Sequence, residues 1–233
     1  MNISEIKSLA KERLVGNHIL VIVLMFLNST VAGILTELSN RFSPNIISYD
    51  PFALVTNPNA NPALSSLFSL GASILAIFLG FALLKIMIDI VRKQKPNLTD
   101  CYSSAFSDDP IKTVVTSFLV GLFALLWSLL FIIPGIIKSY AYGMYLYLLD
   151  VKPDMTASET IKESMKLMDG RKMDLFILDL NYFLHYLLGI FTLGIYWFWV
   201  GPRHQLARII FFEEVYNQAY PQAPAPVLDV EVE

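Results

Sequence analysis

Long windows without a single charged residue constrain the fold of this chain more than any other feature. Four of them cover residues 14–36, 51–84, 113–137 and 180–202. A transmembrane helix needs about 20 mostly apolar residues, because the hydrocarbon layer is about 30 Å thick and a helix rises about 1.5 Å per residue. Windows of this length therefore predict helices that cross a lipid bilayer.

The composition agrees with a membrane protein and excludes several other classes. Only 16% of the 233 residues are charged and 55% are hydrophobic, whereas soluble domains carry about 25% charged residues. A soluble enzyme of this composition would expose large apolar patches. The net charge of -3 provides no basic surface for nucleic acid. The single cysteine, Cys101, excludes an internal disulfide.

The windows and their breaks predict an all-α polytopic membrane helix bundle of about six transmembrane helices. Gly194 is the expected break in the last hairpin, with Gly201-Pro202 as the alternative, because proline removes a backbone donor and disfavours helix before it. Five spans, with the end of the chain in the membrane interface, is the alternative to six. The expected spans are 18–38, 64–91, 113–135, 136–149, 173–193 and 195–216.

The basic residues predict the orientation of these spans. They gather in segments 7–13, 92–95 and 152–172, which fall on one side if the helices alternate, whereas the first outer segment has only Arg41. Because short cytoplasmic loops collect lysine and arginine, both termini are expected in the cytoplasm.

A single integral membrane domain is expected over residues 1–217. It includes an outer loop rich in proline and asparagine at 39–66. A disordered cytoplasmic tail is expected over 218–233, where prolines and acidic residues are frequent.

Two segments outside the spans have the spacing of amphipathic helices. Residues 2–15 are expected to lie in the inner membrane interface, either as an anchor that fixes topology or as a sensor of anionic lipid. A second helix begins at Thr156, where Glu159 completes a capping box, and stops at Gly170. It faces either the membrane or the inner ends of the spans.

Charged residues inside predicted spans are candidate functional residues, because a charge in hydrocarbon is costly. Asp179 and Arg208 are expected at similar depth on the last two helices, so we predict that they pair. Asn181, His185 and His204 either line a polar cavity beside them or form hydrogen bonds between helices.

Asp89 is a further candidate, near the inner end of the second span. Lys85 lies one helical turn before it and Arg92 nearly one turn after it. This spacing predicts local ion pairs within the helix.

No motif of a known catalytic site occurs in the chain. A P-loop, a paired CxxC, an HExxH and a GxSxG are all absent. The three histidines lie on separate segments without metal-ligand spacing. We therefore expect no enzymatic activity, catalytic residue, cofactor or metal.

The expected function is that of an envelope or accessory membrane component. The alternative is a small-solute transporter that uses the polar strip of the last two helices. The expected partners are membrane lipids and no nucleic acid, with a membrane protein or a second copy of the chain left open.

Several short motifs occur in a characteristic order in the second half of the chain. They lie at residues 132–142, 157–180 and 188–194 and continue through Trp199 and Pro202. They resemble the signature of bacterial integral membrane proteins grouped as domain-of-unknown-function family 975. The resemblance covers nearly the whole chain except the outer loop and the tail. It implies a multi-pass protein of a bacterial plasma membrane, in a Gram-positive bacterium, and implies no catalytic residue.

Overall fold

The computed structural model describes residues 3–44, 57 and 59–221, and all regular secondary structure in them is helical. The helices α2, α3, α5 and α9 are long and apolar enough to cross a membrane. The predicted class, an all-α multi-pass membrane protein, is confirmed at this level. The helices are α1 (Ile3–Leu14), α2 (His18–Phe42), α3 (Pro62–Val91), α4 (Leu98–Ser107), α5 (Pro110–Leu130), α6 (Ile132–Tyr142), α7 (Tyr145–Val151), α8 (Ala157–Leu167), α9 (Lys172–Phe191) and α10 (Trp197–Ala219).

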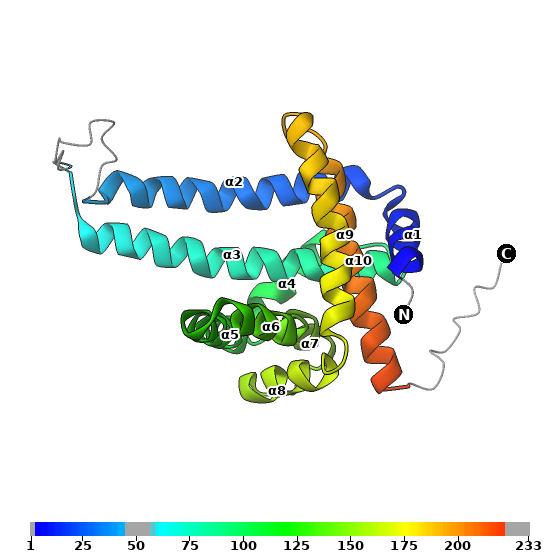
Figure 1. The fold of residues 1–233 in the computed structure, drawn as a ribbon. Helices are drawn as coiled ribbons and strands as arrows, with labels where there is room; N and C mark the ends of the chain where they lie inside the picture. The colour runs from blue at the N-terminus through cyan, green and yellow to red at the C-terminus, as the bar shows by residue number, and fades with distance from the viewer. Residues whose placement is uncertain (1–2, 45–56, 58, 222–233) are drawn as a thin grey trace.

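The chain is built from three consecutive units, each a short helix followed by a helical hairpin (Figure 1). The short helices are α1, α4 and α8, and the hairpins are α2–α3, α5 with α6–α7, and α9–α10. A residue with positive φ links each short helix to its hairpin: Gly16 (+88°), Asp109 (+52°) and Gly170 (+73°). The left-handed backbone reverses the chain sharply at these links, which glycine allows without strain and aspartate tolerates.

The three units interlock, because each short helix packs mainly on a hairpin that is not its own. Helix α1 packs on α10, α4 packs on α3, and α8 packs on α5, α6 and α7. The contacts therefore close a cycle through all three units. We call the packed region where the short helices meet the hairpins the base.

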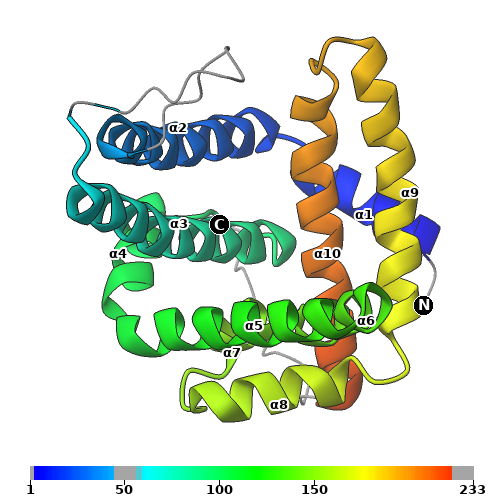
Figure 2. The same cartoon turned by 60° about the vertical axis from the view of Figure 1, so that its left-hand side comes forward.

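The α9–α10 hairpin runs in a different direction from the other two hairpins, unlike the helices of a regular bundle. It stands upright in Figures 1 and 2, whereas α2, α3 and α5 run across both views. The far ends of the hairpins expose large apolar side chains, including Phe131 at 67% and Leu193 at 94%. These ends are the parts of the molecule suited to hydrocarbon.

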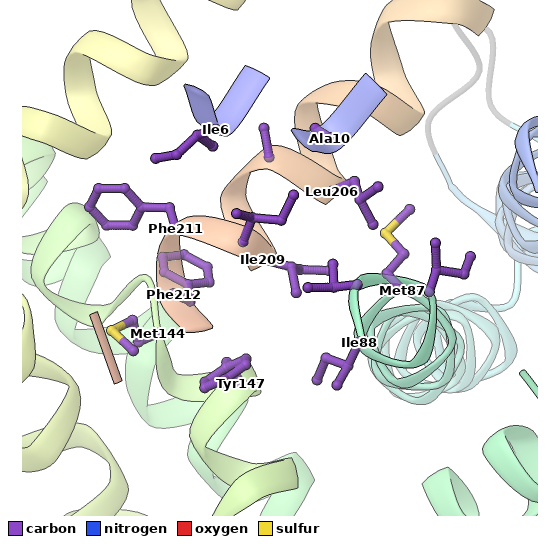
Figure 3. Packing of buried hydrophobic residues seen from close by; sticks show 14 of the residues in the cluster. Ile6, Ala10, Met87, Ile88, Met144, Tyr147, Leu206, Ile209, Phe211 and Phe212 are labelled. Carbon is purple, nitrogen blue, oxygen red and sulfur yellow. The ribbon is translucent and has the colours of Figure 1, made fainter. Parts of the chain in front are cut away.

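The hydrophobic core lies at the base and corrects the expected position of the first helix. Ile6 and Ala10 of α1 face Leu206 and Ile209 of α10 in Figure 3. Ile6, Ala10 and Leu14 are at most 2% exposed. The apolar face of α1 therefore packs on protein and is not free to enter the membrane interface. Burial of an aliphatic side chain such as that of Ile6 stabilises the fold by about 1.5–3 kcal/mol.

The second hairpin turns earlier than the sequence predicts. The turn lies at Phe131, whose extended backbone separates α5 from α6, and not at Pro134-Gly135. Pro134 instead sits in the first turn of α6, where the missing N–H costs no helical hydrogen bond. Gly135 is needed because a Cβ there would overlap Ser128 of α5.

The last hairpin breaks at Gly194, so the first of the two predicted positions is correct. Leu193 and Gly194 both have positive φ between α9 and α10. Pro202 lies inside α10 and does not end it.

The C-terminal boundary also differs from the prediction. Helix α10 continues to Ala219, and the Tyr220 hydroxyl donates to Glu163 of α8. The ammonium of Lys152 lies 3.5 Å from the centre of the Tyr220 ring. Residues 218–220 of the predicted tail therefore belong to the packed fold, whereas residues 222–233, like 45–56 of the outer loop, lie outside the described residues.

Helix α8 has the predicted capping box between Thr156 and Glu159 and packs on α5, α6 and α7. Its buried Ser164 stabilises a break between α6 and α7 that the sequence did not reveal. The Ser164 hydroxyl donates to the carbonyl of Ala141 at 3.0 Å and accepts from the amide of Met144 at 3.2 Å. Both backbone groups would otherwise lack a helical partner at the break.

Substitution Ser164→Ala is expected to lower the free energy of unfolding by about 1–3 kcal/mol, because two buried backbone groups lose their partner. Ser158→Ala, on the exposed face of the same helix, is the matched control and should change stability by less than about 0.5 kcal/mol. Thermal unfolding in detergent measures both. Equal stability of the two variants would show that Ser164 does not support the break.

Candidate functional site

Two polar clusters of the structure contain most of the candidate residues predicted from the sequence. The first cluster lies between α9 and α10 and contains Asp179, His204 and Arg208. The second lies where α3, α4 and α7 meet and contains Lys85 and Asp89.

In the first cluster, Asp179 lies closest to His204. The Asp179 carboxylate oxygen Oδ1 is 2.8 Å from His204 Nε2 and 3.8 Å from Arg208 Nε. The contact expected between Asp179 and Arg208 is therefore present, but the shorter bond goes to the histidine. Asp179 and His204 side chains are each only 17% exposed, so little water competes for this bond.

His204 links the carboxylate to a tyrosine farther along α9. Its second ring nitrogen, Nδ1, lies 3.3 Å from the Tyr186 hydroxyl. The Tyr182 ring stacks on the imidazole at a centroid distance of 4.7 Å. Both ring nitrogens and one ring face are thus occupied by groups from α9, which holds α9 against α10.

Asn181 and His185 do not join this cluster. The Asn181 side-chain oxygen accepts a hydrogen bond of 2.6 Å from the Lys7 ammonium of α1. The His185 Nδ1 lies 2.9 Å from the backbone carbonyl of Asn181, within its own helix. Of the two predicted alternatives, contact between helices holds for Asn181. Sequence reasoning missed Lys7, because it placed the first helix in the membrane interface rather than against α9 and α10.

The prediction that Asp89 forms ion pairs with Lys85 and Arg92 is wrong. Lys85 instead pairs with Asp108 at 3.1 Å and Asp150 at 3.5 Å, and Arg92 pairs with Glu213 at 2.9 Å. Pairs one turn apart on a helix contribute only about 0.2–0.5 kcal/mol, so carboxylates brought in by other helices readily displace them.

Asp89 accepts a hydrogen bond from the Cys101 thiol of α4 at 3.5 Å. Burial, together with the neighbouring Asp89 carboxylate, raises the pKa of Cys101 to about 11. The thiol therefore stays protonated near neutral pH. It acts as a hydrogen-bond donor rather than a nucleophile, since the thiolate is the reactive form.

A few polar atoms of the described residues are buried without a hydrogen-bond partner. They include both ring nitrogens of His18 and Nε of Arg203. The His18 ring packs edge-on against Trp199 at a centroid distance of 4.5 Å. Within residues 3–44, 57 and 59–221, no three side chains of His, Cys, Asp or Glu form a group that could hold a metal ion.

A double-mutant cycle of Asp179→Ala and His204→Ala should show a coupling energy within the range of about 0.5–3 kcal/mol seen for residues in contact. The coupling of Asp179→Ala with Arg208→Ala should be smaller, because that distance is longer. His185→Ala is the control and should add to Asp179→Ala within about 0.5 kcal/mol. Unfolding in detergent provides the stabilities, and additive behaviour of Asp179 and His204 would contradict the geometry.

Comparison with known proteins identifies one family. No curated protein and no solved structure matches the chain. The family model described as "Protein of unknown function (DUF975)" matches residues 129–219, from the end of α5 to the end of α10. Over these residues, the resemblance indicated by the sequence motifs is confirmed: the chain resembles the DUF975 family of proteins of unknown function.

Proposed function

We propose that this protein is a non-enzymatic membrane component of the bacterial cell envelope, held in the plasma membrane by its three hairpins. The observation that carries the proposal is the pairing of the polar side chains in α9 and α10. His204 bonds to both Asp179 and Tyr186, and Asn181 bonds to Lys7. Groups that bond to each other in this way hold helices together, which is the common use of polar residues in membrane helices.

The proposed layout has about six spans, with both termini in the cytoplasm. Helices α6 and α7 return along α5, and α10 returns along α9. Residues 132–151 of α6 and α7 together provide about 20 residues, enough to cross a hydrocarbon layer. Basic residues at the base, including Lys11, Arg92 and Lys172, support a cytoplasmic base.

Cysteine labelling in intact cells tests this layout. In a Cys101→Ala background, single cysteines at Ser107 and Ser158 should react only after the membrane is permeabilised, whereas those at Asn59 and Ile195 should react from outside. All four positions are exposed in the structure. Labelling of the Ser158 position from outside would show that α6 and α7 together do not cross the membrane.

Purification from native membranes tests the accessory role, which predicts a defined lipid or membrane protein that co-purifies in constant ratio. The transporter alternative uses the same α9–α10 cluster and makes a different prediction. Solute flux into vesicles that contain the protein, abolished by Asp179→Ala in a variant that remains folded, would replace our proposal with the transporter.

A further inference from the structure

A cavity of about 1060 Å³ opens at the base of the molecule, where the ends of α1, α3, α7 and α10 meet. Its polar lining includes Arg13, Arg92, Lys93, Asp150 and Glu213. It is separate from the α9–α10 cluster described above. In the proposed layout it faces the cytoplasm, close to the headgroups of the inner leaflet.

Each acidic group of this cavity lies within ion-pair distance of a basic side chain. Glu213 pairs with Arg92 at 2.9 Å, and Asp150 pairs with Lys85 at 3.5 Å. For Arg13 and Lys93, no carboxylate of the described residues lies within 4.0 Å of the charged nitrogens. The three cations and two carboxylates of the lining leave a net charge of +1, and Arg13 and Lys93 are the cations without a carboxylate partner.

Arg13 lines three neighbouring cavities of the base. Besides the main cavity, it lines two further cavities of about 450 and 290 Å³, and Lys93 lines the smaller of the two as well. Leu14, the next residue of α1, is 1% exposed. The anchored end of α1 thus holds the Arg13 backbone in place.

Lys93 is presented by an uncommon backbone conformation. Its φ is +60°, and the turn is held by hydrogen bonds from the Lys93 amide to Ile90 and from the Gln94 amide to Asp89. A lysine rarely adopts the left-handed region without compensation. The conformation leaves the Lys93 side chain among the groups that line the cavity.

We propose that this cavity binds a phosphate-bearing ligand, with Arg13 and Lys93 as its cationic contacts. A guanidinium donates two parallel hydrogen bonds to phosphate oxygens, and an ammonium adds a point charge. The amides of Gln94 and Asn217, which also line the cavity, supply neutral donors. The phosphate belongs either to a phospholipid headgroup or to a soluble compound, and the two sources are separable by experiment.

The test measures how a ligand protects a cysteine placed in the cavity. The full chain, with Asn217→Cys in a Cys101→Ala background, is reconstituted in nanodiscs and reacted with an uncharged maleimide. One arm adds inorganic pyrophosphate to phosphatidylcholine nanodiscs, and the other replaces half of the phosphatidylcholine by phosphatidylglycerol. Two measurements on the unsubstituted chain record binding without the introduced cysteine or the label. Calorimetry measures the binding of pyrophosphate, and native mass spectrometry detects bound lipid.

Protection in the pyrophosphate arm identifies a soluble phosphate compound, and protection only in the phosphatidylglycerol arm identifies the headgroup of an anionic phospholipid. In the arm that shows protection, Arg13→Gln and Lys93→Asn should each weaken binding about tenfold, the effect of losing one hydrogen bond to a charged group. Arg13→Lys should retain part of the affinity, because it keeps the positive charge. Asparagine is chosen at position 93 because it tolerates the left-handed backbone there.

Lys11→Gln is the matched control, because Lys11 is an exposed cation on the same helix that lines none of the three cavities. It should leave protection unchanged. The absence of protection in both arms, or an equal loss in Lys11→Gln and Arg13→Gln, would overturn the proposal and leave these cations with a role in topology alone.

Discussion

The structure depends on the burial of three short helices by hairpins other than their own. The inward faces of α1, α4 and α8 include Ala10, Ala105 and Ser164, all fully buried. Small side chains at these positions let the short helices approach their neighbours closely. Because α1 packs on α10, α4 on α3 and α8 on the second hairpin, no unit can bury its short helix alone. The base therefore forms only when all three units are present.

This arrangement explains why α10 differs from the other long helices. It carries Arg203, His204, Arg208 and Glu213 and does not have the composition of a membrane span, yet much of it is buried. Its neighbours are protein on several sides, namely α1, α3 and α9, so its polar groups meet side chains rather than lipid. In the proposed six-span layout, α10 crosses the membrane in spite of its composition, because protein rather than hydrocarbon surrounds much of it.

Local features of this fold were predictable from the sequence, and the choice of partners was not. The capping box of α8 and the break at Gly194 depend on residues a few positions apart, so their pattern is visible in the chain. The contact of Asp179 with α10 followed from equal depth on two adjacent helices. The partners of Lys85 and Asn181 come from α7 and α1, which only the packing of the base brings near.

The same packing leaves some charges of the molecule paired and others unpaired. Between α9 and α10, Asp179 and His204 meet where little water reaches them, and a hydrogen bond in such surroundings is strong only while both partners remain. At the base, Arg92 and Lys85 neutralise the carboxylates that surround them, which leaves Arg13 and Lys93 unmatched beside an open cavity. Paired charges hold the hairpins in position, and the unpaired Arg13 and Lys93 of the cavity favour an anion.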